Sequence, residues 1–378
     1  MAVIAIFCDG TWNRIDSADQ THVARLAMAC AQNRAQKVLY FEGVGTGTGR
    51  ISDLGRWVSK VGGGLFGWGL NRNIKAAYMA LCRIYQPGDK IMVFGFSRGA
   101  YTARSLVGMI RKCGIVADPT EAVVARAFKL YRMRGAKNAP DMPHIQAARR
   151  VLSPNFATSA ADVMRRNDHS YLVRITDLGV WDKVGALGIP QSLAGPLATL
   201  WNRRYRFHDT ALSSLVENAR HAVALDERRV TFQPSLWDNL DDPQRRGLNR
   251  GDRSDTRPYQ QQWFSGNHSI VGGSGVPKAL TTASLYWITA GAVSLGLALG
   301  LDQDRSDVLV DAAAPAPELY KVNRLYSLLP WLLRWRAGPE HARDLHPTAR
   351  LRSVLAPAYR PKSLRKSLPG LFRVANPH

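Results

Sequence analysis

The pentapeptide Gly95-Phe96-Ser97-Arg98-Gly99 places a serine between two glycines in the pattern G-x-S-x-G. A short apolar run precedes it, and apolar residues recur at helical spacing from Ala100 to Ile110. Strand, turn and helix in this order predict a nucleophile elbow, a strained turn that exposes the serine hydroxyl. An ordinary tight turn is the alternative, because the bare pattern is common. The flanking strand and helix favour the elbow.

A serine nucleophile requires a base and a group that orients the base. His268 follows a strand-like apolar run and keeps the order Ser…Asp…His that is typical of hydrolases with this elbow. A lone histidine is more often structural, but this position favours a base. The aspartates of residues 177–185 follow a predicted strand over residues 171–176, where the acid belongs. His221 lies in a stretch that reads as an apolar helix, and we expect it to be structural.

The tripeptide Asp9-Gly10-Thr11 follows the first predicted strand, residues 2–8. In elbow hydrolases, an N–H group from a loop at that position and the N–H group after the serine bind the oxyanion. The sequence therefore predicts Gly10, Thr11 and Arg98 as donors, with Asp9, Gly95 and Gly99 as supporting residues. The alternative is a plain strand-end turn that caps a helix.

Strands and helices alternate through the first half of the chain, which predicts a parallel sheet with right-handed crossovers. Predicted strands over residues 2–8, 37–41 and 91–94 alternate with helices over residues 20–33 and 71–85. The predicted fold class is α/β, an α/β-hydrolase-like, doubly wound and mostly parallel sheet with helical insertions and a basic C-terminal extension. The predicted division is a catalytic domain over residues 1–305, insertion or lid segments over 135–170 and 186–215, and an extension over 306–378 that packs on the domain.

The composition is strongly basic, with 51 Lys and Arg against 29 Asp and Glu and a net charge of +22. Such a balance suggests an anionic partner, or simply a solvated basic surface. The sequence has no zinc-finger or RNA-binding signature, so we expect no nucleic acid partner. The N-terminus lacks the charged region of a signal peptide, and Cys8 and Cys82 look like buried free thiols. We therefore expect synthesis in the cytoplasm.

Two apolar segments near the C-terminus raise the question of a membrane. Residues 279–301 carry no charge, but their glycines and hydroxyl residues favour a buried helix over a membrane span. Residues 325–336 mix aromatic, apolar and basic side chains, as interfacial segments do. The membrane-contact candidates are Trp331, Arg334, Trp335 and Arg336. On a helix the two tryptophans share a face. A helix packed on the domain is the alternative.

With these stretches in place, the sequence resembles a family of α/β-hydrolase-like proteins that includes the first family of bacterial type VI secretion lipase effectors, which are phospholipases. The similar stretches follow one another along most of the chain: Phe7–Asn13, Gly43–Thr46, Gly95–Arg104, Gly179–Gly185, His221–Arg229 and Trp263–Gly273. This combination is far more specific than the pentapeptide alone. The chain departs from the family pattern at Ile270 and Ser274 of the histidine loop, where the family has an acidic residue and a glycine.

The resemblance implies a role for each of three side chains. Ser97 is the expected nucleophile, Asp182 the acid and His268 the base. Three other aspartates remain alternative acids: Asp177, Asp226 and Asp9. Neither a metal nor an organic cofactor is needed for this chemistry.

The expected function is cleavage of carboxylic esters of phospholipids, as in an antibacterial secreted phospholipase. The resemblance implies three partners: a phospholipid membrane, a cognate immunity protein and an adaptor of the secretion machine. It also implies export into the periplasm of a target cell. One alternative is a soluble carboxylesterase with a non-lipid substrate. Another is a catalytically silent module that binds a membrane or a protein.

Overall fold

A parallel sheet organises the computed structural model, which describes residues 1–10, 13–17, 19–44, 64–166, 170–184, 211–241, 247–275, 278–300, 330–356 and 358–372. In this part of the chain, six strands form the sheet in the order β2-β1-β3-β6-β7-β8, and all neighbours are parallel. The strands are β1 (Val3–Cys8), β2 (Gln36–Phe41), β3 (Lys90–Phe96), β6 (Asp177–Trp181), β7 (Ala219–Ala224) and β8 (Tyr259–Phe264). Their carboxyl ends therefore meet at one edge.

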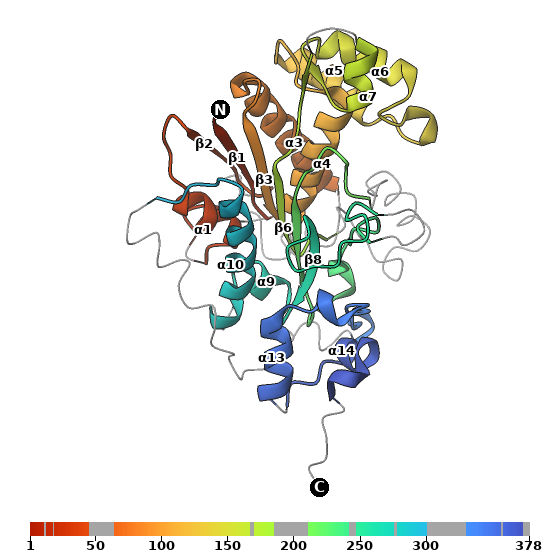
Figure 1. Cartoon of the computed structure of the whole chain (residues 1–378). Coiled ribbons are helices and arrows are strands. Elements are labelled where there is room, and N and C mark those ends of the chain that lie inside the picture. Colours follow the sequence, from red (N-terminus) through yellow and green to blue (C-terminus); the bar gives the residue numbers. More distant parts are fainter. Residues whose placement is uncertain are drawn as a thin grey trace.

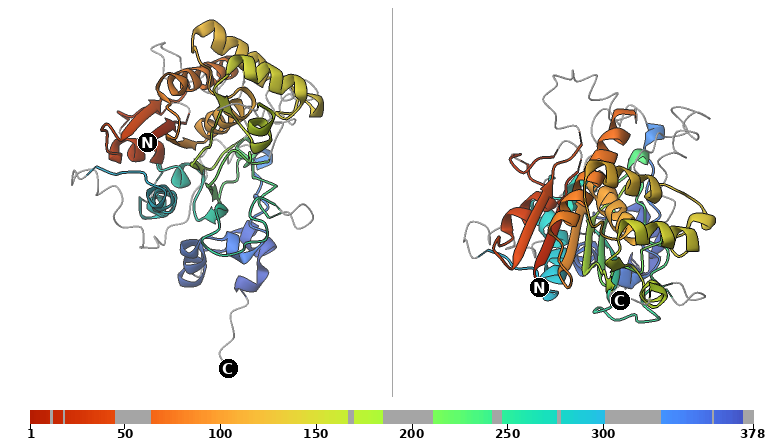
Figure 2. Two further views of the ribbon diagram at one scale, coloured as in Figure 1. Left: turned by 45° about the horizontal axis from the view of Figure 1, so that its top comes forward. Right: turned by 90° about the horizontal axis from the view of Figure 1, so that it is seen from above.

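Helices cover both faces of the sheet (Figures 1 and 2). Helices α3 (Gly64–Ile84), α4 (Arg98–Cys113) and α5 (Glu121–Tyr131) lie on one face, and α1 (His22–Ala29) and α10 (Lys278–Ser294) on the other. Successive side chains of a strand point to opposite faces. Ile4 and Ile6 accordingly belong to the first core cluster, and Ala5 and Phe7 to the second. The predicted α/β fold class is confirmed.

Local signals explain where the first elements begin and end. Helix α1 is shorter than predicted, because the Thr21 side chain caps it by accepting a hydrogen bond from Ala24 N (3.2 Å). Helix α3 begins at Gly64, seven residues before the start of the helix predicted over residues 71–85.

Two predictions of secondary structure are wrong. The strand predicted over residues 171–176 is instead β6, which begins at Asp177. Strand β5 (Tyr171–Leu172) pairs separately with β4 (Phe156–Ala157). The stretch around His221, predicted to be helical, is strand β7, which lies between β6 and β8. A strand that is buried on both faces shows no alternation, so a short apolar run cannot be told from a helix by its period.

The predicted insertion over residues 135–170 lies beyond the amino ends of the strands, in yellow and yellow-green in Figure 1. It contains α6 (Pro143–Leu152) and α7 (Ala160–Arg166). Buried Asp162 of α7 ties the two helices together by pairing with Arg149 of α6 (2.9 Å), and it also pairs with Arg166 of its own helix (3.2 Å). The insertion is therefore remote from the carboxyl edge of the sheet. Of the second predicted lid segment, residues 186–210 lie outside the described part of the chain.

The described C-terminal residues pack at the carboxyl end of the sheet, in blue in Figure 1. They include α13 (Pro347–Leu355) and α14 (Lys362–Ser367). Leu345, Ala349 and Leu364 form a third core cluster with Val223 and Trp263 of the sheet. Of the predicted extension, residues 306–329, 357 and 373–378 lie outside the described part of the chain.

The apolar stretch after residue 278 forms α10, which ends at Ser294 and packs against the sheet. In the described part of the chain, no helix combines the length and the apolar character that a membrane span requires.

Candidate active site

Ser97 stands in a strained turn between β3 and α4. Its φ of 57° lies in the left-handed region, which is costly for a residue with a side chain. A Cβ atom on Gly99 would lie 2.0 Å from the carbonyl oxygen of Cys8, and one on Gly95 would lie 2.6 Å from that of Gly99. Only glycine at both positions lets α4 approach the sheet this closely. The predicted strand, turn and helix are all present.

Three side chains from separate loops form a continuous hydrogen-bonded chain. Ser97 Oγ lies 2.8 Å from His268 Nε2, and His268 Nδ1 lies 2.6 Å from Asp182 Oδ2. All three residues are buried. They follow the carboxyl ends of β3, β8 and β6 respectively, so the parallel sheet brings them to one edge.

The loop after β8 fixes the position of His268. His268 opens the short helix α9 (His268–Val271), and the side chain of Asn267 caps this helix by accepting a hydrogen bond from Ile270 N (2.9 Å). Two phenyl rings pack against the imidazole with centroids 4.7 Å away, Phe96 at an interplanar angle of 31° and Phe232 at 62°. These contacts oppose rotation of the imidazole away from Ser97 sterically.

A second acidic residue supports the histidine loop. Glu227, buried beyond β7, accepts a hydrogen bond from the backbone N of His268 (3.2 Å) and pairs with Arg229 (2.6 Å). Burial raises the pKa of this carboxyl group, but hydrogen bonding and charge from Arg229 outweigh that effect and leave it lowered. Our sequence analysis did not single out Glu227, although it lies in a stretch that resembles the family.

Arg336 reaches the site from the C-terminal segment. Its Nη1 donates to Asp182 Oδ1 (2.7 Å) and its Nη2 donates to Asp182 Oδ2 (2.9 Å). The same guanidinium group donates to the backbone carbonyls of Ala224 (2.6 Å) and Phe232. The prediction that Arg336 contacts a membrane is therefore wrong, because its side chain is 1% exposed and points into the sheet edge.

These contacts determine the charge state of the site. Burial alone would raise the pKa of Asp182, but Arg336 and then His268 outweigh it and hold that pKa far below its usual value. Burial lowers the pKa of His268, and the neighbouring Asp182 compensates only in part. At neutral pH the site therefore holds an ionised carboxylate and a neutral imidazole. A neutral imidazole can accept a proton from the serine.

Of the two predicted oxyanion donors that the structure describes, one N–H group lies at a helix N-terminus and the other is already hydrogen-bonded. Arg98 is the first residue of α4, so its N–H group lies at the helix N-terminus beside Ser97. Gly10 N instead donates to Asp9 Oδ1 (2.6 Å), so this conformation does not offer it to a ligand. Thr11 lies outside the described residues. Asp9 also accepts hydrogen bonds from the hydroxyl groups of Thr21 (2.8 Å) and Tyr40 (2.6 Å), which makes it a structural anchor.

The alternative acids Asp177 and Asp226 lie at other positions or bind other partners. Asp177 begins β6 at the opposite end from Asp182, and burial raises its pKa to about 7. Asp226 accepts hydrogen bonds from Gly266 N (2.7 Å) and from the hydroxyl group of Tyr359 (2.8 Å), so it anchors the start of the loop that carries His268. Only Asp182 of these aspartates is hydrogen-bonded to His268 among the described contacts.

His221, expected to be structural, lies within the sheet. Its Nδ1 is 3.0 Å from Gln261 Oε1, and its Nε2 accepts a hydrogen bond from Lys183 N (3.3 Å). Burial lowers its pKa to about 3, so the ring is neutral at neutral pH.

The two tryptophans of the C-terminal segment do not share a helix. A short 3₁₀ turn, η4 (Pro330–Leu332), ends before Trp335. Trp331 is 61% exposed, whereas Trp335 is half-buried beneath the guanidinium group of Arg228, 5.0 Å from its ring centroid. Arg334 is exposed, and its backbone N donates to the Arg228 carbonyl (2.6 Å). Within this segment the surface candidates are thus Trp331 and Arg334.

The sheet order and the strained serine turn after β3 define an α/β-hydrolase-like protein. A family described as "T6SS, Phospholipase effector Tle1-like, catalytic domain" matches residues 3–291. The chain belongs to this family of Tle1-like type VI secretion phospholipase effectors.

Three similar proteins share between 16% and 32% sequence identity with this chain. An uncharacterised protein of Saccharomyces cerevisiae, YEL023C, is 32% identical over 169 residues, which is 45% of this chain and 22% of the yeast protein. A crystal structure of an uncharacterised protein from Pseudomonas aeruginosa is 16% identical with a TM-score of 0.45, over 82% of this chain and 48% of that one. A structure of the Tle1 effector bound to the VgrG spike is 18% identical with a TM-score of 0.37, over 72% of this chain and 51% of that one. The chain thus spans about a fifth to a half of these proteins.

Proposed function

We propose that this protein is a serine esterase in which Ser97, His268 and Asp182 form the catalytic triad. The observation that carries the proposal is the continuous hydrogen-bonded chain from Ser97 Oγ through the imidazole to Asp182. As Oγ attacks the ester carbonyl, His268 Nε2 accepts its proton, and Nδ1–H remains bonded to Asp182. The histidine then returns the proton to the leaving alkoxide, which departs as the alcohol.

Deacylation of Ser97 uses the same groups, with water in place of the serine hydroxyl as the proton donor to the imidazole. His268 removes a proton from water, the resulting hydroxide attacks the acyl-enzyme carbonyl, and Ser97 leaves with the proton returned by the imidazole. The N–H group of Arg98 at the start of α4 is the proposed oxyanion donor. No step requires a metal or an organic cofactor.

Arg336 completes the acid side of the proposed triad. Its two hydrogen bonds hold both oxygens of Asp182, so the carboxylate cannot rotate away from His268 Nδ1. The bond from Ala224 N to Asp182 Oδ1 (2.9 Å) adds a third constraint. A carboxylate held in this way fixes the imidazole tautomer in which Nε2 is unprotonated and faces Ser97.

The proposed substrate is a phospholipid, cleaved at a carboxylic ester as by a phospholipase A. Family membership supports this class, and the net charge of +22 favours an anionic lipid surface. Exposed Trp331 and Arg334 are the proposed membrane contacts of the described C-terminal segment. One relative of known structure is bound to a secretion spike, so we also propose a secretion-machine partner and action on target-cell membranes. A cognate immunity protein is the third proposed partner.

Lipid-product analysis tests the proposal most directly. Wild-type protein and Ser97→Ala are incubated with vesicles of mixed phospholipids, and free fatty acid and lysophospholipid are measured by mass spectrometry. We expect release by the wild type and a loss of about 10³-fold or more in the variant. Release of both products by Ser97→Ala at the wild-type rate would contradict the assignment. Hydrolysis of a short soluble ester without lipid products would favour the carboxylesterase alternative, and inactivity on both would favour a silent binding module.

A further inference from the structure

Glu227 lies where two loops of the proposed active site meet. Its side chain is fully buried, and it follows the carboxyl end of β7. Oε2 accepts a hydrogen bond from the backbone N of His268 (3.2 Å), and Oε1 accepts hydrogen bonds from the backbone N of Arg228 (3.0 Å) and of Arg229 (2.8 Å). One carboxylate therefore joins the loop after β7 to the loop that carries the proposed base.

The guanidinium group of Arg229 binds the same carboxylate at two points. Its Nε donates to Oε1 of Glu227 (2.8 Å), and its Nη2 donates to Oε2 (2.6 Å). A two-point pair of this kind fixes the direction of the guanidinium group. The guanidinium carbon lies over the ring of Phe232, 3.8 Å from its centroid. Glu227 thus determines where Arg229 lies, and Arg229 packs on Phe232.

Phe232 extends this arrangement to the imidazole. Its ring packs against His268 with centroids 4.7 Å apart, and its backbone carbonyl accepts a hydrogen bond from Arg336. Glu227 therefore reaches His268 by two routes, one through the backbone N and one through Arg229 and the phenyl ring. Both routes act on the base rather than on the ester.

Charged groups face the imidazole from three parts of the chain. Asp182 lies after β6 and is paired with Arg336 of the C-terminal segment. Glu227 lies after β7 and is paired with Arg229. Burial has the largest effect on the pKa of His268 and lowers it, whereas Asp182 raises that pKa. Of the second pair, Arg229 lowers the pKa and Glu227 raises it, so the pair places two charges of opposite effect beside the base.

We propose that Glu227 is a positioning residue of the triad, which holds the His268 imidazole in place through the loop backbone and the Phe232 ring. The inference rests on the proposed esterase function. An unpaired carboxylate at this place would stabilise the imidazolium form, which cannot accept the serine proton. Because Arg229 offsets its charge, Glu227 fixes the loop while the base stays neutral.

Kinetics on a short soluble ester test the proposal. We expect Glu227→Gln to lower kcat by about tenfold or more with little change in KM, because a displaced imidazole weakens only the transition state. The pH profile of kcat/KM separates this role from a merely structural one. The midpoint of the acidic limb should move to lower pH in Glu227→Gln, which removes a negative charge, and to higher pH in Arg229→Gln, which removes a positive one. Arg229→Lys keeps the charge and should keep the wild-type midpoint.

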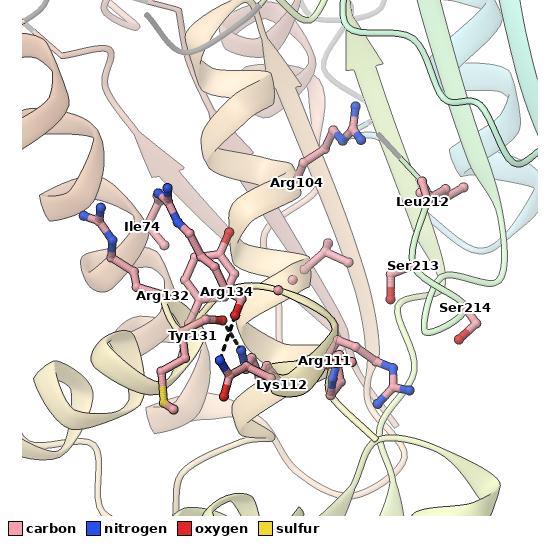
Figure 3. A pocket seen from close by; sticks show the side chains of 18 of the residues that line it. Ile74, Arg104, Arg111, Lys112, Tyr131, Arg132, Arg134, Leu212, Ser213 and Ser214 are labelled. Atoms are coloured by element: carbon pink, nitrogen blue, oxygen red, sulfur yellow. Dashed lines mark hydrogen bonds between the residues drawn. The ribbon is translucent and has the colours of Figure 1, made fainter. Parts of the chain in front are cut away.

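Two variants remote from the triad are matched controls. Asp162→Asn breaks another buried pair of a carboxylate with arginine, in the insertion beyond the amino ends of the strands. It should lower the thermal midpoint and leave kcat and the pH midpoint as in the wild type. Arg132 lines a cavity beside α4 (Figure 3), whose described lining includes neither Ser97 nor His268, and its guanidinium group lies over the ring of Phe128, 6.0 Å from the centroid. Arg132→Gln should leave kcat and the pH midpoint unchanged.

The outcomes separate this inference from the proposed function. Wild-type kcat and pH midpoints in both Glu227→Gln and Arg229→Gln, beside an inactive Ser97→Ala, would overturn the role of Glu227 and leave the triad intact. Midpoints that move in the same direction in the two variants would overturn the charge argument. Hydrolysis by Ser97→Ala at the wild-type rate would overturn the triad and this inference with it. If Glu227→Gln does not fold, Arg229→Gln and Arg229→Lys decide the proposal, and equal midpoints in these two variants would overturn it.

Discussion

Arg336 and Asp182, 154 residues apart in sequence, form a two-point ion pair in which both side chains are almost fully buried. Arg336 lies outside the residues that match the family, 3–291. The pair therefore joins the C-terminal segment to a carboxylate that belongs to the family's catalytic domain. A buried ion pair of this kind is favourable only when both partners are present, because each charge alone would be desolvated without compensation.

Removing Arg336 should damage stability and activity together. We expect Arg336→Ala to lower the free energy of unfolding by about 3–5 kcal/mol, since it leaves the Asp182 carboxylate buried and unpaired. Urea denaturation measures this change, and hydrolysis of a soluble ester measures activity. Arg334→Ala is the control, because Arg334 is exposed and contacts the Arg228 carbonyl through its backbone N. Equal stability of Arg336→Ala and the wild type would contradict the structural role of the pair.

The pH dependence of kcat/KM should report the neutral form of His268. The folded-state pKa of this histidine is lowered from 6.5, mainly by burial, so the base stays deprotonated to below that pH. We therefore expect the acidic limb of the profile to have its midpoint below pH 6.5. In Arg336→Gln the negative charge of Asp182 is no longer offset, which stabilises imidazolium, so the midpoint should move to higher pH. A midpoint well above 6.5 in the wild type would argue against His268 as the base.

Two isosteric substitutions test which aspartate is the acid of the proposed triad. We expect Asp182→Asn to reduce kcat by up to about 10⁴-fold, because an amide cannot hold the imidazole in the required tautomer. Asp177→Asn should leave kcat close to the wild-type value, since Asp177 lies at the far end of β6. Both variants are compared by steady-state kinetics, with circular dichroism as the check of folding. A silent Asp182→Asn beside an inactive Asp177→Asn would move the acid to Asp177.

The elbow should not tolerate a side chain at Gly99. A methyl group there would lie 2.0 Å from the carbonyl oxygen of Cys8 and 2.5 Å from that of Asp9, and these backbone atoms at the end of β1 cannot move aside cheaply. We expect Gly99→Ala to lower the thermal midpoint and abolish labelling of Ser97 by a fluorophosphonate probe. Gly370→Ala, where a Cβ atom meets nothing within 4 Å, should behave like the wild type in both measurements.

The two tryptophans of the C-terminal segment should have separable effects. Trp331 is 61% exposed, so Trp331→Ala should weaken binding to anionic vesicles in high salt and leave the thermal midpoint unchanged. Trp335 packs beneath Arg228, so Trp335→Ala should lower the thermal midpoint. Vesicle flotation and thermal denaturation measure the two effects. Loss of stability in Trp331→Ala without a change in flotation would contradict a membrane role for this segment.

The serine turn could be predicted from sequence because its determinants are local. An apolar strand, two glycines and a helix lie within about twenty residues, and steric exclusion at Gly95 comes from the turn itself, since a Cβ atom there would meet Gly99 and Ala100. The exclusion at Gly99 is a tertiary effect, because it comes from Cys8 and Asp9. The order of strands and helices likewise predicted a parallel sheet, since short crossovers leave few other arrangements. The position of His268 after a strand-like run and the order Ser…Asp…His already favoured this histidine as the base, whereas the choice of Asp182 among several aspartates required the resemblance to a family.

The position of Arg336 and the identity of β7 depended on contacts between distant parts of the chain. An arginine among aromatic residues has the same local sequence whether it faces lipid or a buried carboxylate, and the path of the chain after η4 directs it to Asp182. The stretch around His221 became a strand because both of its neighbours, β6 and β8, offer backbone hydrogen bonds there. Pairing energy and desolvation are properties of the assembled sheet, so a local pattern cannot encode them.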